Sequence, residues 1–102
     1  MSTGNPIEAL EAELPNAMKA FRELHDAVAG DGALPARTKK LIMIGISVAI
    51  RCEPCIRMHV AGAKEMGISR EEILEAAGVA VLLGGGPAAA YSGLFLLDEL
   101  NA

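Results

Sequence analysis

The chain has 102 residues, of which 52% are hydrophobic and 22% are charged, and its formal net charge is −4. This size and composition exclude a disordered chain and predict one compact domain over residues 1–102. Two Phe, one Tyr and no Trp, with scattered Lys and Arg, argue against a nucleic-acid surface, which needs clustered cations and stacking rings.

The N-terminal region shows no secretion signal, because no basic segment is followed by an apolar one, and we expect a cytoplasmic protein. Residues 1–14 are expected to be partly frayed, as chain ends commonly are. Over residues 15–29, apolar side chains recur every three or four positions, which predicts an amphipathic helix. His25 lies beside this stripe and is interpreted as a partly exposed surface residue. The stripe consists of Met18, Phe21, Leu24 and Val28.

The remainder of the chain predicts four further helices, giving an all-α fold of about five helices. Residues 41–50 are apolar on every side, so their spacing alone does not separate a strand from a buried helix. We favour a helix over 36–51, because no second β-rich segment is present to pair with a strand. Ser69 and Glu72 have the spacing of a helix-capping pair. The other helices are expected at 54–66, 70–83 and 88–100, and Met58, Met66, Leu94 and Leu97 are expected to face the core.

Residues 76–97 contain no charged side chain, which is also the pattern of a membrane span. Glycines and a proline at 84–87 would break such a span and leave backbone groups unsatisfied in lipid. Two buried helices joined by a tight turn explain the pattern better. Because a domain of this size buries only about two thirds of its surface, the apolar excess predicts a closed homo-oligomer.

Cys52 and Cys55 are the two cysteines of the chain. Cysteines three positions apart at a helix start have Cα atoms about 5–6 Å apart, which a disulfide can span. Cys55 is expected in the first helical turn, where backbone N–H groups favour the thiolate. His59 lies one turn further along the same face, within reach for proton exchange with Cys55. The pattern indicates a reversible thiol–disulfide site.

A zinc half-site is the main chemical alternative, since Cys52, Cys55 and His59 offer three ligands. The fourth ligand would then come from a neighbouring subunit, because His25 is the only other histidine. His59 by itself is also compatible with a hydrogen-bonded core residue. Its spacing from the cysteine pair favours the redox role, in which no metal is expected.

Four segments resemble, in order, the carboxymuconolactone decarboxylase family, specifically its alkylhydroperoxidase AhpD-like branch. They lie at residues 38–41, 51–59, 67–72 and 84–87, and the resemblance extends over residues 15–100. It implies an all-α fold, trimeric or hexameric assembly, and reduction of peroxides by a cysteine pair without a metal or organic cofactor.

The resemblance also implies a role for each site residue. Cys55 attacks the peroxide, Cys52 resolves the resulting sulfenic acid as a disulfide, and His59 relays protons. The implied partners are a small hydroperoxide as substrate and a dithiol reductant, either a protein or a small thiol.

Two positions depart from the family pattern. Redox members carry a glutamate twelve positions before the first cysteine, where this chain has Lys40. A cation there is expected to stabilise the Cys55 thiolate without accepting the proton that His59 passes on. Pro54 replaces the histidine often found between the cysteines. Glu53 offers a carboxylate but is interpreted as a solvated charge at the helix N-terminus.

These residues support three hypotheses of function. The first is a thiol-dependent peroxidase or disulfide oxidoreductase that uses the cysteine pair and the relay histidine. The second is an oligomeric redox sensor or binding module with little turnover, which the lysine at position 40 favours. The third, carboxymuconolactone-type decarboxylation, is disfavoured because that reaction needs proton donors or an electron sink and has no use for a disulfide pair.

Overall fold

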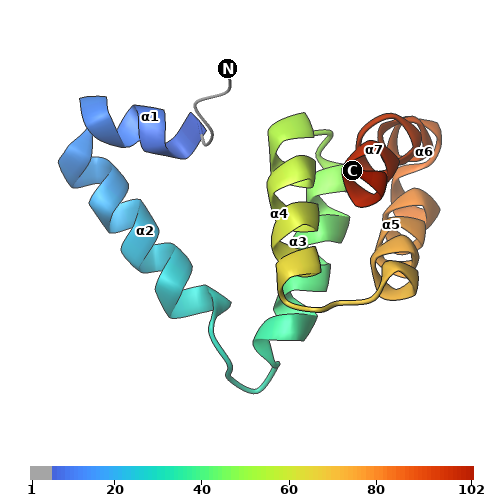
Figure 1. Cartoon of the computed structure of the whole chain (residues 1–102), viewed down its shortest axis with the longest axis horizontal. Coiled ribbons are helices and arrows are strands. Elements are labelled where there is room, and N and C mark those ends of the chain that lie inside the picture. Colours follow the sequence, from blue (N-terminus) through green and yellow to red (C-terminus); the bar gives the residue numbers. More distant parts are fainter. Residues whose placement is uncertain (1–5) are drawn as a thin grey trace. The chain divides into compact units, whose positions relative to one another are not determined.

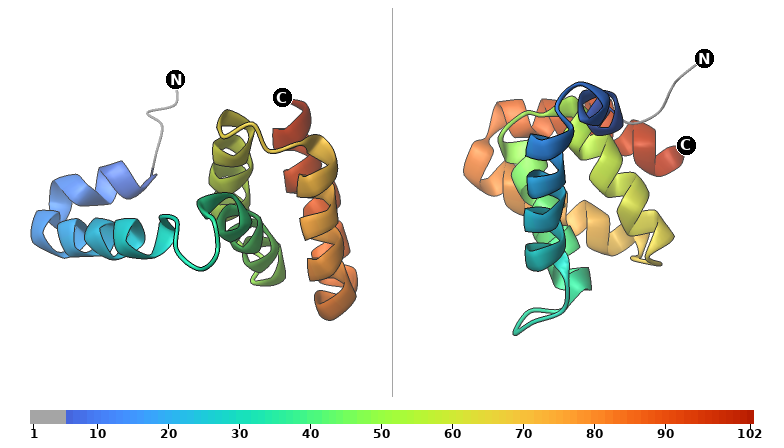
Figure 2. Two further views of the ribbon diagram at one scale, coloured as in Figure 1. Left: turned by 90° about the horizontal axis from the view of Figure 1, so that it is seen from below. Right: turned by 90° about the vertical axis from the view of Figure 1, so that its left-hand side faces the viewer.

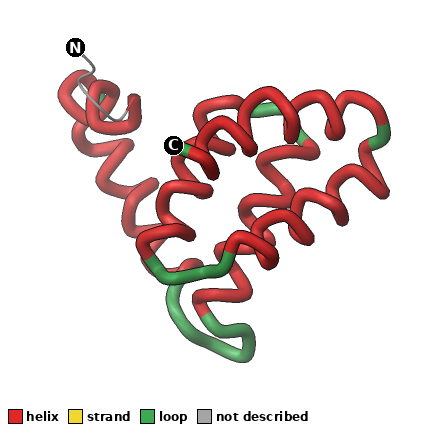
Figure 3. Tube along the Cα trace, turned by 45° about the vertical axis from the view of Figure 1, so that its right-hand side comes forward, coloured by secondary structure: helices red, strands yellow, loops and turns green. Residues whose placement is uncertain are grey.

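The computed structural model describes residues 6–102, which form helices joined by loops (Figure 3). The predicted all-α class is confirmed for these residues, none of which lies in a strand. The elements are α1 (Pro6–Glu13), α2 (Pro15–Ala29), α3 (Ala36–Ala49), α4 (Glu53–Glu65), α5 (Arg70–Gly84), α6 (Gly86–Tyr91), the π-helical segment η1 (Ser92–Leu96) and α7 (Leu97–Asn101). Because α6, η1 and α7 follow one another without interruption, the described chain has six helices rather than about five.

The chain divides into two compact units, the first ending at Asp31 and the second spanning Gly32–Ala102. The single domain over residues 1–102 stays a prediction. In the first unit, α1 packs against α2, and Arg22 Nε donates a hydrogen bond to Glu11 Oε2 at 2.8 Å. Residues 6–13 form the helix α1, and the expected fraying of residues 1–14 stays a prediction; residues 1–5 lie outside the described range.

The amphipathic helix predicted over residues 15–29 is confirmed as α2. It has Pro15 in its first turn, where a missing N–H costs nothing, and it ends at Gly30. Met18 is buried, but the other three members of its apolar stripe are each more than half exposed. His25 is exposed, as expected, with Nδ1 3.2 Å from the Asp26 carboxylate.

The second unit is organised around α3, which packs against both α4 and α5 (Figure 1). Figure 2 shows α5 and the run from α6 to α7 beside the α3 and α4 pair from two further directions. An all-round apolar helix suits a position between two neighbours. The largest fully buried side chains are Ile44, Val48, Ile56, Val60, Ile73 and Leu96.

Backbone and side-chain caps set the ends of these helices. α3 ends at Ala49 rather than Arg51, because Arg51 adopts the left-handed conformation with φ of 57°. The predicted capping pair is confirmed: Ser69 Oγ accepts the Glu72 N–H at 3.2 Å, and Glu72 Oε1 accepts the Ser69 N–H at 3.0 Å. Gly85, with φ of 69°, breaks the charge-free run between α5 and α6. None of the helices within residues 6–102 is long and apolar enough to cross a membrane.

Three of the expected core residues are instead exposed. Met58 and Met66 are 36% and 44% exposed, because α4 turns Ile56, Val60 and Ala63 toward the core. Leu94 is 62% exposed. It lies in η1, where the wider π-helical turn changes the register that an α-helical spacing predicts. Leu97 packs against the core, as expected.

Candidate functional site

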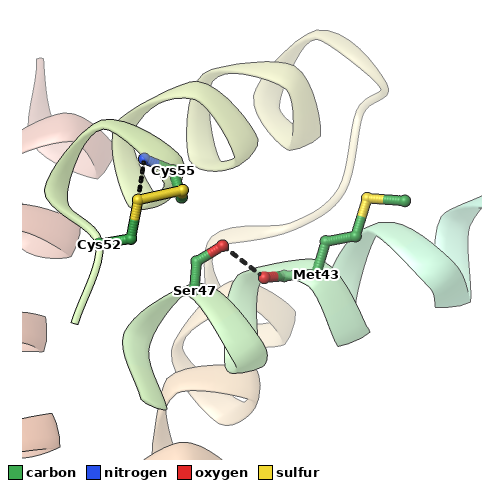
Figure 4. The surroundings of a disulfide bond; sticks show 4 residues. All are labelled: Met43, Ser47, Cys52 and Cys55. Atoms are coloured by element: carbon green, nitrogen blue, oxygen red, sulfur yellow. Dashed lines mark hydrogen bonds between the residues drawn. A yellow bond between two sulfur atoms is a disulfide. The ribbon is translucent and has the colours of Figure 1, made fainter. Parts of the chain in front are cut away.

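The two cysteines lie where the chain turns from α3 into α4. Cys52 and Cys55 are joined in a disulfide with Cα atoms 5.2 Å apart, within the range expected from their spacing (Figure 4). The left-handed Arg51 reverses the chain, and the Cys52 N–H donates to the backbone oxygen of Ser47 at 3.1 Å. The sharp turn thus ties the start of the cysteine motif to the last turn of α3.

Cys52 is the N-cap residue of α4. Its sulfur accepts a hydrogen bond from the Cys55 N–H at 3.2 Å, and Pro54 occupies the first turn. A sulfur in this position faces the positive end of the helix dipole, which favours a thiolate when the disulfide is reduced. The amide donor points at Cys52, whereas the sequence argument considered only the environment of Cys55. Both cysteine residues are partly exposed.

His59 and Lys40 meet between α4 and α3. Lys40 Nζ lies 3.2 Å from His59 Nδ1, and both side chains are partly buried. Burial lowers the pKa of Lys40, because a charged ammonium is less well solvated there. The two residues meet because α3, which carries Lys40, packs against α4, which carries His59. The lysine contacts the histidine ring directly.

Glu53 belongs to a separate cluster of charges. Its carboxylate accepts from Arg57 Nε at 3.0 Å, and Arg57 Nη1 donates to Asp98 Oδ2 at 2.8 Å. Arg57 also lies over the Phe95 ring, 5.6 Å from its centroid. The two carboxylates raise the pKa of Arg57. Glu53 is therefore an exposed charge at the start of α4, as interpreted from the sequence. Its pairing with Arg57 was not predicted.

Sequence reasoning missed two residues of this region. Ser47 is buried, and its hydroxyl donates to the Met43 backbone oxygen at 2.6 Å beside the cysteine turn (Figure 4). Gly62 lies next to Lys40: a Cβ at this position would be 3.2 Å from Lys40 Nζ. The available signals were a lone serine in an apolar run and a glycine three positions after His59, and neither is specific.

An apolar groove of about 370 Å³ lies between α3 and α5, apart from the cysteines. Ile42 and Ile46 line one side, and Val79 and Leu83 line the other. Leu83 is 83% exposed, so this surface offers a large apolar area. Within residues 6–102, no group of three or more His, Cys, Asp or Glu side chains is arranged to hold a metal ion.

The helical fold and the bridged cysteine pair define a small all-α protein with a dithiol site. The family model of the carboxymuconolactone decarboxylase family matches residues 15–99, and the chain belongs to this family.

Among relatives, an uncharacterized protein of Cupriavidus necator is 36% identical over 96 residues, covering 92% of this chain and 85% of that protein. A protein of the cox locus of Paracoccus denitrificans is 40% identical over 84 residues, covering 80% of this chain and 76% of that protein.

Two solved structures share the fold and the family. One is a carboxymuconolactone decarboxylase family protein of Legionella pneumophila in its apo form. It has a TM-score of 0.87 and 36% identity, and the match covers 93% of this chain and 84% of that one. The other is a family protein of Thermotoga maritima, named for a possible role in the antioxidative response. It has a TM-score of 0.76 and 33% identity, and the match covers 83% of this chain and 87% of that one.

Proposed function

We propose that this protein is a thiol-dependent peroxidase or disulfide oxidoreductase of the AhpD-like branch. The observation that carries the proposal is the Cys52–Cys55 disulfide at the start of α4, with His59 one turn further along the same helix. A disulfide that closes so short a loop constrains the unfolded chain little, which favours a reversible redox role over stabilisation. The antioxidative role named for the Thermotoga maritima relative is in line with this chemistry.

The proposed cycle begins with the reduced pair. The Cys55 thiolate attacks a small hydroperoxide and becomes a sulfenic acid. Cys52 then displaces water from that sulfenic acid and forms the disulfide. A dithiol reductant, either a protein or a small thiol, restores both thiols by exchange. His59 moves protons during these steps, and no metal or organic cofactor takes part.

The proposal also covers the assembly of the protein and its location. We propose that the protein acts in the cytoplasm as a homo-oligomer, a trimer or hexamer. Leu82 and Leu83 are 80% and 83% exposed, and burial of such side chains between subunits is favourable. Light scattering at micromolar concentration is expected to give a multiple of the 10.6 kDa chain mass. A clean monomer would contradict this part of the proposal.

A thiol titration tests the redox function. The reduced protein is mixed with one equivalent of hydroperoxide, thiols are counted before and after, and mass spectrometry locates any disulfide. Loss of two thiols and a bond between Cys52 and Cys55 is the expected result. Two unreacted thiols, or a tightly held zinc ion in the purified protein, would overturn the proposal.

Turnover separates an enzyme from a sensor. With excess hydroperoxide and a dithiol such as dithiothreitol, an enzyme consumes many equivalents of peroxide per chain, whereas a sensor reacts once and is reduced slowly. The variant Cys55→Ser is the matched control, because serine preserves the size and cannot be oxidised in this way.

A further inference from the structure

Lys40 Nζ lies 3.2 Å from the ring nitrogen Nδ1 of His59. An ammonium group has donors and no acceptor, so Nδ1 accepts with its lone pair and the ring proton lies on Nε2. We propose that Lys40, acting through His59, supplies the proton that the departing alkoxide takes when Cys55 attacks a hydroperoxide. This inference rests on the peroxidase function proposed above.

The surroundings of Lys40 hold its ammonium group at this position. The side chain leaves α3 and passes Gly62 on α4, where a Cβ would lie 3.2 Å from Nζ and 3.6 Å from Cε. The absence of a side chain at position 62 therefore leaves the room that Lys40 occupies. Burial lowers the pKa of Lys40, so its ammonium gives up a proton more readily than that of an exposed lysine.

The proposed step balances as follows. The Cys55 thiolate forms a bond to the terminal peroxide oxygen, the O–O bond breaks, and the sulfur loses two electrons as the peroxide becomes an alkoxide. The alkoxide takes the proton of His59 Nε2, and Nδ1 takes a proton from Lys40. The products are a sulfenic acid, an alcohol and a neutral lysine. Cys52 then condenses with the sulfenic acid, releasing water, and Lys40 regains its proton from solvent.

A comparison of two oxidants tests this role. The reduced full-length protein is oxidised with tert-butyl hydroperoxide, whose alkoxide must be protonated, and with peracetic acid, whose acetate leaves without a proton. Lys40→Gln can still donate a hydrogen bond to Nδ1 but supplies no proton. We expect it to slow the first reaction about tenfold or more and the second less than about twofold.

Two outcomes would overturn the inference. An equal loss with both oxidants would mean that Lys40 acts on the thiolate rather than on the leaving group, and no loss with either would remove it from the reaction. Lys39→Gln is the matched control, expected to behave as wild type with both oxidants, because the Lys39 ammonium lies near Gly32. If the wild type forms no disulfide with any oxidant, the proposed function itself fails.

Two measurements keep the test independent of damage to the fold. Gly62→Ala requires the Lys40 ammonium to shift by a few tenths of an ångström yet favours the helix, so we expect slower oxidation by tert-butyl hydroperoxide with an unchanged or higher melting temperature. Nitrogen-15 NMR of the reduced wild type is expected to show the His59 proton on Nε2. A proton found on Nδ1 of the neutral ring would overturn the inference.

Discussion

The N-termini of α4 and α5 are each capped by the side chain just before the helix, but the capping atoms differ. At α5, the Ser69 hydroxyl accepts an amide N–H, and Glu72 completes a reciprocal pair. At α4, the sulfur of Cys52 accepts the equivalent N–H. Sulfur is the weaker acceptor, so the cap of α4 gives less helix stability than a serine cap. The same local geometry thus provides a reciprocal cap at α5, whereas at α4 it places the sulfur of Cys52, one half of the disulfide, at the helix N-terminus.

Among the variants that test this comparison of α4 and α5, Cys55→Ser is expected to have the largest effect. It removes the proposed nucleophile from α4, so turnover of hydroperoxide with a dithiol should fall by a factor on the order of 10³ or more. Ser69→Ala, at the cap of α5, is the control and should leave turnover unchanged. Peroxide consumption by Cys55→Ser at the wild-type rate would contradict the assignment of the nucleophile.

Cys52→Ser separates the capping role of this residue from its redox role. Serine caps a helix well, so the reduced variant should be as stable as the reduced wild type, or up to about 1 kcal/mol more stable. Disulfide formation is lost, and oxidation should stop at a Cys55 sulfenic acid that a dimedone probe traps. Urea unfolding of both reduced proteins gives the stability comparison. A marked destabilisation would show that the sulfur does more for the fold than cap α4.

Ser69→Ala should lower the free energy of unfolding by about 1 kcal/mol, because the orphan N–H of Glu72 loses its acceptor. Chemical denaturation of wild type and variant measures this change, with Ser69→Asn expected to recover most of it. Equal stability of the alanine variant and the wild type would mean that water replaces the hydroxyl at no cost.

The smallest expected effect is a pH dependence at the cap of α5. Hydrogen bonds from Ser69 and the charge of Arg37 lower the pKa of Glu72 below its ordinary value of 4.5. The stabilisation is therefore fully present above that value and is lost as pH falls through the lower pKa of the folded state. Glu72→Gln should flatten the dependence of the free energy of unfolding on pH in this acid range. The dependence at higher pH should be unchanged. An identical acid profile in the variant would contradict the prediction.

Local signals in the sequence were sufficient for much of this molecule. The break at Gly85 and the capping pair at Ser69 were predictable because each depends on backbone preferences within one helical turn. The count of helices was less predictable, since α1 has no buried residue and no strong amphipathic pattern to mark it. Leu94 was misplaced because a π-helical segment leaves no clear trace in residue spacing.

By itself, the sequence determined the cysteine pair, its position before a helix and the histidine one turn later. Those relations follow from spacings of three and four residues, which helix geometry fixes. Only the tertiary structure decided that Lys40, 19 positions before His59, contacts its ring and lies beside Gly62. That contact depends on how α3 packs against α4, and such packing is set by many distant side chains together, so no local pattern contains it.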